Sequence, residues 1–284
     1  MNKTIAVTGS SGFIGKNVCI SLRRNGYNVV EIDSERGFDI RVINNFSSLP
    51  DYDVIVHLAA RSFVPDSFKE PLDFYQTNIN GTLNVLESAR QKKANVIFFS
   101  SYLYGTPKYL PVDENHELRP HNPYANSKLI GEKLCEAYFN DFNLSTTVFR
   151  PFNIYGNDQN GNFLIPTILS QLENEEVHLL DSIPKRDYIH VSDVVSAISC
   201  AIDANLNGYE CFNLGSGKSF SVEHIAKALM EISKSEANLV FSNSARKSEV
   251  LDCYADITKT VEMLNWKPQV SIKQGLEQII NGRK

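Results

Sequence analysis

Three glycines near the N-terminus, spaced Gly9-x-x-Gly12-x-x-Gly15, constrain the fold of this chain more than any other feature. They stand between a short β-branched run, Thr4–Thr8, and a helical pattern that continues to Arg24. In a strand–turn–helix unit the first glycine permits a tight turn, and the second lets a pyrophosphate approach the backbone. The third packs helix on strand, and the helix N-terminus adds amide donors and a partial positive charge. The spacing therefore predicts a dinucleotide-binding turn, although a glycine-rich turn without a ligand stays open.

A phosphate loop of the nucleoside-triphosphatase type is a rival interpretation of the same glycines. That loop requires GxxxxGK followed by Ser or Thr. Here Gly15-Lys16 is followed by Asn17, and Ser10 does not fit the motif either. We therefore reject the phosphate loop.

Strands and helices alternate along the first half of the chain. Continuous apolar runs predict further strands at 27–32, 54–58, 96–101 and 145–149, and helical spacing predicts helices at 75–90 and 123–142. Strands that are apolar throughout, rather than alternating, are typical of a parallel sheet with both faces covered. The sequence thus predicts an α/β fold, a doubly wound, Rossmann-like parallel sheet over residues 1–152.

After Arg150 the pattern loosens, with a polar, turn-rich stretch at 157–162 and helical patterns at 164–172, 191–204 and 221–233. Ligands of open α/β sheets bind at the carboxyl edge of the strands. We expect residues 153–284 to form mainly a small C-terminal substrate-binding lobe against that edge, with later segments returning to the first domain.

Asp33 ends the second predicted strand, where a carboxylate can accept both ribose hydroxyls of an adenosine. The same carboxylate would repel a 2′-phosphate, which favours NAD over NADP. Arg36 could hold that phosphate if its loop turned inward, so NADP remains the less favoured cofactor. A solvated loop residue is the alternative for Asp33.

Tyr124 and Lys128 lie one turn apart on one face of the predicted helix at 123–142. A phenol with a pKa near 10 is a poor base at neutral pH. We expect the adjacent ammonium and an oxidised nicotinamide to lower that pKa, so that Tyr124 exchanges a proton with a substrate hydroxyl. Ser100 and Ser101 end the preceding strand, where a hydroxyl can donate to the substrate oxygen; a capping role is the alternative.

Composition excludes several other classes. The formal net charge of -5 offers no general attraction to nucleic acid or to an anionic membrane. The five cysteines are scattered and lack CxxC spacing, which argues against a disulfide framework and a zinc site. No run approaches the roughly 20 apolar residues of a membrane span, and the N-terminus does not resemble a signal peptide. We expect a cytoplasmic protein without a metal.

Several short motifs together resemble the extended short-chain dehydrogenase/reductases, and within them the nucleotide-sugar epimerase, dehydratase and reductase group. The resemblance runs from Lys3 to about Ile280, and its motifs are TGSSGFIG (8–15), Asp33, HLAA (57–60), SSYLYG (100–105), the Tyr124/Lys128 pair and RPFNIYG (150–156).

By this resemblance Tyr124 is the acid/base, Lys128 orients it, and Ser101 is the substrate-side hydroxyl, while counting back from Tyr104-Gly105 selects Ser100 instead. The resemblance implies that Asp39 and Ile40 contact the adenine and that Asn78 (TNINGT) braces the adjoining loop. All the residues implied at the cofactor are Gly9, Gly12, Phe13, Ile14, Gly15, Asp33, Asp39, Ile40, Leu58, Ala59, Ala60 and Asn78. Those implied at the substrate are Asn153, Asn162 and Phe163 (GNFLIP), Arg186 (KRDYIHVSD) and Arg246 (RKSEV). An arginine suits a diphosphate because its planar fork grips phosphate oxygens in pairs; for both arginines a solvated surface charge is the alternative.

The sequence departs from the family pattern in two places. Family dehydratases carry an acidic pair after the catalytic Ser or Thr, whereas Tyr102-Leu103 follows Ser101 here, so 4,6-dehydration is not expected. The stretch from Asp33 to Val54 leaves little room for the usual third strand and its helix, as in some family reductases.

The favoured function is a 4-epimerase of a nucleotide-activated hexose, linked to UDP, dTDP, CDP or GDP. The alternatives are a 4-keto-6-deoxy nucleotide-sugar reductase that consumes NAD(P)H and a non-catalytic, dinucleotide-binding regulator. A homodimer is expected from the resemblance alone.

Overall fold

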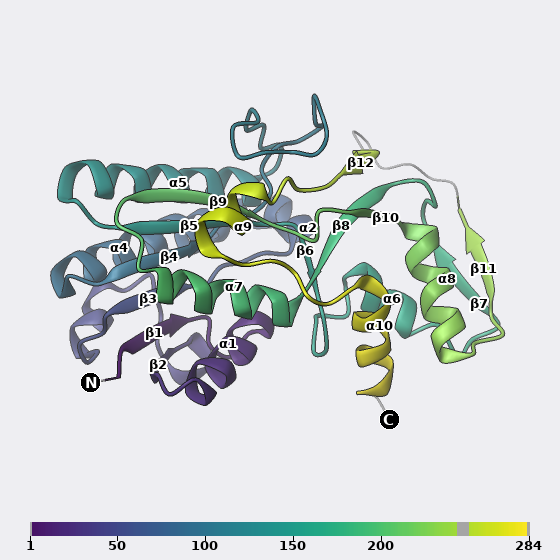
Figure 1. Cartoon of the computed structure of the whole chain (residues 1–284), viewed down its shortest axis with the longest axis horizontal. Coiled ribbons are helices and arrows are strands. Elements are labelled where there is room, and N and C mark those ends of the chain that lie inside the picture. The colour runs from purple at the N-terminus through teal and green to yellow at the C-terminus, as the bar shows by residue number, and fades with distance from the viewer. Residues whose placement is uncertain (1, 243–249, 283–284) are drawn as a thin grey trace.

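A six-stranded parallel sheet forms the centre of the protein (Figure 1). The computed structural model describes residues 2–242 and 250–282. The sheet has the order β2-β1-β3-β4-β5-β9, with bounds Asn28–Ile32, Thr4–Thr8, Val54–His57, Asn95–Phe99, Thr146–Pro151 and Tyr209–Leu214. The chain starts at β1, next to the edge strand β2, and proceeds first to that edge and then across the sheet to β9. The strand order therefore reverses beside β1, which is where ligands of such sheets bind.

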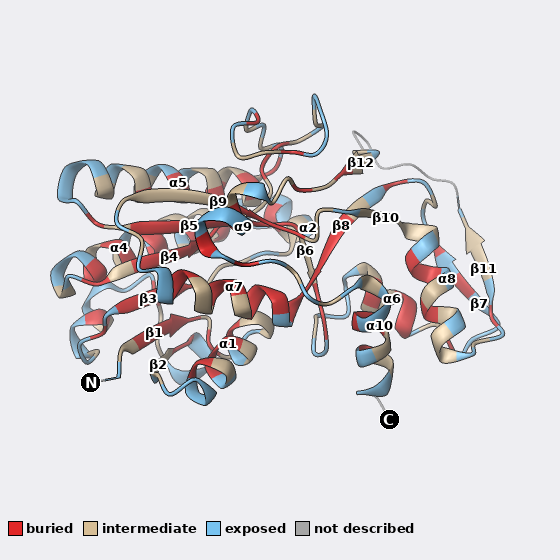
Figure 2. Ribbon diagram, viewed as in Figure 1, coloured by how far each residue is buried: buried red, intermediate tan, exposed pale blue. Residues whose placement is uncertain are grey.

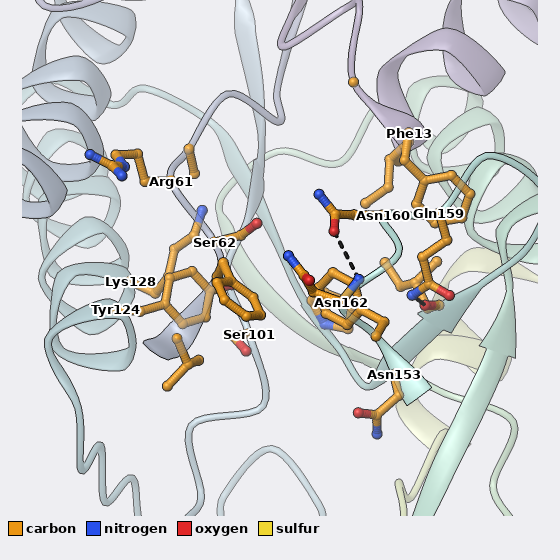
Figure 3. A pocket seen from close by; sticks show the side chains of 18 of the residues that line it. Phe13, Arg61, Ser62, Ser101, Tyr124, Lys128, Asn153, Gln159, Asn160 and Asn162 are labelled. Carbon is orange, nitrogen blue, oxygen red and sulfur yellow. Dashed lines mark hydrogen bonds between the residues drawn. The ribbon is translucent and has the colours of Figure 1, made fainter. Parts of the chain in front are cut away.

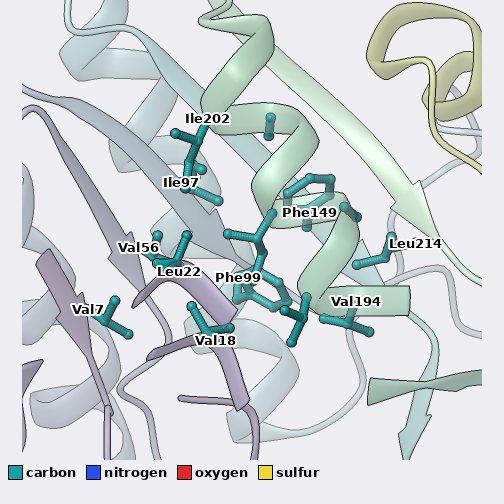
Figure 4. Close-up of a cluster of buried hydrophobic side chains, with 14 of the residues drawn as sticks. Val7, Val18, Leu22, Val56, Ile97, Phe99, Phe149, Val194, Ile202 and Leu214 are labelled. Carbon is teal, nitrogen blue, oxygen red and sulfur yellow. The ribbon is translucent and has the colours of Figure 1, made fainter. Parts of the chain in front are cut away.

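Helices cover both faces of this sheet, as the sequence predicts. On one face α1 (Phe13–Arg24) and α7 (Val191–Ala204) bury Val18, Leu22 and Val194 against the strands (Figure 4). On the other face α4 (Gly81–Lys92) and α5 (Pro123–Phe142) bury a second apolar cluster. The predicted α/β, Rossmann-like class is confirmed.

The stretch between β2 and β3 is as short as the sequence indicates. It holds two 3-10 helices, η1 (Ser34–Arg36) and η2 (Ile43–Ser48), in place of a strand and an α-helix. Strand β2 is therefore an edge of the sheet, and a loop rather than a further βα unit borders the cleft on this side.

The predicted helix at 75–90 is part of a longer, irregular helical run. Short helices α2 (Val64–Lys69) and α3 (Pro71–Tyr75) precede a π-helical stretch, η3 (Gln76–Asn80), which leads directly into α4. Wide π turns of this kind occur often at functional sites. Here the π turn includes Asn78, whose buried side chain connects two parts of the cleft wall.

A smaller lobe lies beyond the carboxyl edge of the sheet and has its own apolar core (Figure 2). In it β8 (Lys185–His190) pairs with β6 (Asn153–Tyr155), β10 (Ser219–Ser221) and β12 (Asp252–Cys253), and β7 (Glu176–Leu179) pairs with β11 (Asn238–Phe241). Helices α6 (Leu164–Leu169), α8 (Val222–Ser233) and α10 (Ile272–Asn281) pack on these strands.

Later segments return to the large sheet. Strand β9 pairs in parallel with β5, α7 covers the sheet, and α9 (Thr258–Leu264) packs on β9. The chain thus passes between the sheet and the lobe more than once. Within the part of the chain that the structure describes, no helix combines the length and the apolar character needed to cross a bilayer.

Candidate active site

One large cleft separates the carboxyl edge of the sheet from the lobe (Figure 3). Its volume is about 2260 Å³. That exceeds the roughly 300–1,000 Å³ of a typical single-ligand pocket, so the cleft has room for two ligands. Its wall runs from the glycine-rich turn past Tyr124 to Arg186 on β8.

The glycine-rich turn forms one end of the cleft and packs without spare space. Gly9 has φ +69°, and a Cβ there would lie 2.8 Å from the backbone nitrogen of Ala59. A Cβ on Gly15 would lie 2.0 Å from the carbonyl oxygen of Gly9. The turn therefore exposes bare backbone at the N-terminus of α1, which fits a dinucleotide pyrophosphate. Gly12, Phe13 and Ile14 also line this end.

Asp33 lies beside the turn and is already part of its structure. One carboxylate oxygen accepts from the backbone N–H of Ser11 at 2.9 Å, and the other accepts from that of Glu35 at 3.0 Å. Arg36, the candidate for a 2′-phosphate, instead forms an ion pair with Glu31. The carboxylate thus faces the cleft beside the turn while the guanidinium is held on Glu31.

Asp39 and Ile40 line the same end of the cleft, on the loop that replaces the missing βα unit. Arg41 forms an ion pair with Asp39, and this hydrogen bonding lowers the pKa of the Asp39 carboxyl. Ile40 is buried against the α4 backbone, since a Cβ on Gly81 would lie 2.5 Å from its side chain.

The loop after β3 also lines the cleft, through Leu58, Ala59 and Ala60, and its Ala59 lies against Gly9. Asn78 does not line the cleft but supports this loop, because its buried side chain bonds to the loop backbone. Its side chain accepts from the N–H of Arg61 at 2.9 Å and donates to the carbonyl of Arg61 at 3.0 Å and to the hydroxyl of Ser127 at 2.8 Å. It thus ties the loop after β3 to helix α5.

Helix α5 carries the Tyr124/Lys128 pair to the middle of the cleft. Asn122 caps the helix by accepting from the N–H of Ala125 at 2.8 Å, and Pro123 opens its first turn. The ammonium of Lys128 donates to the carbonyl of Phe99 at 2.7 Å, at the end of β4. Figure 3 shows both side chains on one side of the cleft, facing Asn160 and Asn162 on the other.

Burial has the largest influence on the pKa values of this pair. Burial raises the pKa of Tyr124 to about 12, and the Ser101 hydroxyl offsets only part of that rise. Burial also lowers the pKa of Lys128 to about 8. Desolvation thus has the largest effect on both groups, and the expectation that the ammonium and an oxidised nicotinamide together lower the pKa of Tyr124 stays a prediction.

Ser100 and Ser101 both line the cleft but differ in surroundings. The hydroxyl of Ser101 lies beside the Tyr124 phenol and affects its pKa. The N–H of Ser100 donates to the carbonyl of Phe149 at 2.8 Å, and its buried hydroxyl has no hydrogen-bond partner among the described residues. The geometry therefore favours Ser101 as the partner of Tyr124.

The lobe supplies the opposite side of the cleft with the expected residues. Asn153, Asn162, Phe163 and Arg186 all line it, whereas Arg246 lies outside the described residues. The Asn153 amide donates to the carbonyl of Asp187 at 2.9 Å. Arg186 donates to the carbonyls of Lys185 and Val250.

Other cleft residues escaped the sequence analysis. Arg61 and Ser62 directly follow HLAA, and Arg61 forms ion pairs with Glu70 and Asp73. Gln159 and Asn160 belong to the polar stretch at 157–162, which faces Tyr124 across the cleft (Figure 3). The sequence could have indicated them, because Arg61 and Ser62 adjoin the HLAA motif and Gln159 and Asn160 adjoin the GNFLIP motif.

Comparison with known proteins agrees with this geometry. Residues 5–215 match the model of the NAD dependent epimerase/dehydratase family. This chain belongs to that family.

Individual relatives match this chain over nearly its whole length. A putative UDP-glucose 4-epimerase of Methanocaldococcus jannaschii is 32% identical, over 99% of this chain and 98% of the relative. The UDP-glucose 4-epimerase of Bacillus subtilis is 28% identical, over 97% and 94%. The crystal structure of a Thermotoga maritima UDP-glucose 4-epimerase with UDP-glucose superimposes with a TM-score of 0.92 at 31% identity, covering 98% and 97% of the two chains.

The family assignment confirms the resemblance drawn from the motifs. The protein is an NAD-dependent enzyme of the nucleotide-sugar epimerase kind, with the extended short-chain dehydrogenase/reductase architecture. A related UDP-glucose 4-epimerase of Bifidobacterium longum was solved in complex with NAD+ and UDP, with a TM-score of 0.87 at 26% identity over 98% of this chain and 97% of that one.

Proposed function

We propose that this protein is a 4-epimerase that interconverts UDP-glucose and UDP-galactose. The observation that carries the proposal is the position of Tyr124 and Ser101 midway along a cleft with a dinucleotide turn at one end and Arg186 at the other. The names of the relatives favour uridine diphosphate among the nucleotides that the sequence leaves open.

The side chains divide the work at carbon 4 of the sugar. Ser101 donates a hydrogen bond to the 4-oxygen, and Tyr124 takes the proton from that oxygen and later gives it back. Lys128, fixed on the Phe99 carbonyl, supplies positive charge from the same side. The glycine-rich turn would hold NAD, which would supply reversible hydride transfer at carbon 4 while Tyr124 handles the proton on oxygen.

The raised pKa of Tyr124 fits this division of work. A phenol with a pKa of about 12 is protonated at neutral pH, so Tyr124 needs additional positive charge to act as a base. A bound nicotinamide in its oxidised form would supply positive charge that favours the phenolate of Tyr124. Proton transfer is thereby coupled to cofactor binding.

Asp33 favours NAD as the cofactor, because its carboxylate would accept from the ribose hydroxyls and would repel a 2′-phosphate. Arg36 is held on Glu31 and does not compensate. Titration of Asp33→Ala with both cofactors tests this preference: NAD affinity should fall at least tenfold more than NADP affinity, and equal losses would contradict it.

A 4-keto-6-deoxy nucleotide-sugar reductase is the second candidate. The observation in its favour is the trimmed stretch between β2 and β3, which leaves a loop in place of a βα unit beside the cofactor end. A reductase exchanges its cofactor in every turnover, and an open cofactor end suits that need. A non-catalytic regulator is disfavoured because Ser101, Tyr124 and Lys128 all lie together in the cleft.

One assay separates the two enzymes. With UDP-galactose and a trace of NAD, an epimerase forms UDP-glucose to equilibrium without net change in absorbance at 340 nm. Stoichiometric loss of NADH with a 4-keto-6-deoxy sugar nucleotide, and no epimerisation of UDP-sugars, would replace the proposal with the reductase. A homodimer and a cytoplasmic location stay predictions.

A further inference from the structure

Tyr102 lies in the cleft and has no part in the chemistry described above. It follows Ser101 directly and lines the cleft. Its ring stacks on Phe152, with ring centroids 5.1 Å apart and planes 14° from parallel. The stacking fixes the ring, so the phenol oxygen has a defined place.

Among the residues that the structure describes, the Tyr102 hydroxyl makes only a long hydrogen bond to an acceptor. It donates to the side-chain oxygen of Asn153 at 3.4 Å, well beyond the 2.7–2.8 Å usual for such a bond. Burial raises its pKa, so the group is a protonated donor at neutral pH. The Arg186 guanidinium donates a hydrogen bond to the same hydroxyl oxygen, which leaves the phenol proton available for an acceptor on a ligand.

The neighbours of Tyr102 indicate which part of a ligand it meets. The Arg186 guanidinium is close enough to offset part of the rise in its pKa. On the other side Tyr102 contributes to the raised pKa of Tyr124. Tyr102 therefore lies in the cleft close to both Tyr124, which acts on carbon 4, and the Arg186 guanidinium.

A sugar nucleotide that contacts both Tyr124 and Arg186 would place its sugar-linked phosphate beside Tyr102. A charged phosphate oxygen is a stronger acceptor than the amide oxygen of Asn153. A neutral phenol is also suited to this place, since a carboxylate there would repel the phosphate.

We propose that Tyr102 is a substrate-binding residue that donates a hydrogen bond to the phosphate next to the sugar. The inference rests on the proposed function, because it takes a nucleotide sugar as the ligand. In this inference Tyr102 contacts the diphosphate and takes no part in the proton transfer by Tyr124.

The test uses NAD-loaded Tyr102→Phe protein, which keeps the stacked ring and loses only the hydroxyl. By calorimetry the Kd of UDP and that of UDP-glucose should each rise about tenfold, as expected for one hydrogen bond to a charged group. The KM for UDP-galactose should rise in parallel while kcat stays within about twofold, because the contact is the same in ground and transition states. Tyr109→Phe is the matched control, since it removes an exposed hydroxyl bonded to Asp113 and should change nothing.

Each other outcome overturns a stated part of the inference. Unchanged affinity for both ligands would show that Tyr102 makes no such bond, and a loss confined to UDP-glucose would move the contact to a sugar hydroxyl. An equal loss of NAD affinity would mean that the hydroxyl acts on the fold of the cleft. If the unaltered protein binds and turns over no nucleotide sugar, the proposed function itself fails, and this inference falls with it.

Discussion

The two sides of the cleft are built in opposite ways. The catalytic corner, formed by Ser101, Tyr124 and Lys128, rests on the end of β4 and on the long helix α5, and its charged group is buried. The substrate loop, residues 157–163, is mostly exposed, and its amides bond to their own segment, as when the N–H of Asn162 donates to the side chain of Asn160. Side chains that transfer a proton need a fixed position. A loop that contacts a sugar which rotates during the reaction can function in more than one conformation. We therefore expect substitutions in the corner to abolish turnover and those in the loop to adjust it.

The largest effect is expected from Tyr124→Phe. Removing the hydroxyl leaves the ring and the packing but deletes the proton carrier, and kcat should fall roughly 10²–10⁴-fold. Steady-state epimerisation of UDP-galactose measures the change, and NAD affinity by titration should move by less than about threefold. Turnover within tenfold of the unaltered enzyme would show that the corner is not the site of chemistry.

Lys128→Met should lower kcat by roughly 10²-fold, because the positive charge that assists Tyr124 is lost. The same substitution should raise the free energy of unfolding at neutral pH. The folded pKa of about 8 lies below the 10.5 of an ordinary lysine, so the buried ammonium destabilises the fold at neutral pH. That penalty is full below pH 8 and fades as the pH rises toward 10.5.

Thermal melts of the ligand-free proteins check this sign. At pH 7 Lys128→Met should melt roughly 2–4 °C higher than the unaltered protein, even though the Phe99 carbonyl loses its donor. The gap should shrink at pH 10. A variant less stable at pH 7 with a gap independent of pH would mean that the ammonium carries no desolvation penalty.

The smallest effect is expected in the substrate loop. Asn162→Ala removes one exposed amide, and kcat/KM for UDP-galactose should fall about two- to fivefold, mainly through KM. Asn140→Ala, which also removes one exposed amide but lies on α5 outside the cleft lining, serves as the control and should behave as the unaltered enzyme. A hundredfold loss in Asn162→Ala would show that the loop is as fixed as the corner.

Local features of the sequence explain why the corner could be predicted. The glycine-rich turn and the Tyr124/Lys128 pair are short-range patterns whose spacing sets their geometry. The choice between Ser100 and Ser101 was different, because it depends on how the loop after β4 lies against α5. That placement is a tertiary contact, and the structure puts Ser101 beside Tyr124.

Burial explains what the sequence could not supply. The raised pKa of Tyr124 arises from desolvation by residues distant in the chain, which no spacing reveals. Strands such as β6, β10 and β12 are only two or three residues long and exist through pairing with β8, so they leave no periodic signal. The sequence therefore predicted that a C-terminal lobe exists but did not predict its strands.

The central claim is that Tyr124 moves only the proton on oxygen while the hydrogen of carbon 4 never reaches water. UDP-galactose deuterated at carbon 4, epimerised in ordinary water and followed by NMR, tests it directly. We predict that the UDP-glucose formed keeps its deuterium at carbon 4. Replacement of that deuterium by solvent hydrogen would contradict the account.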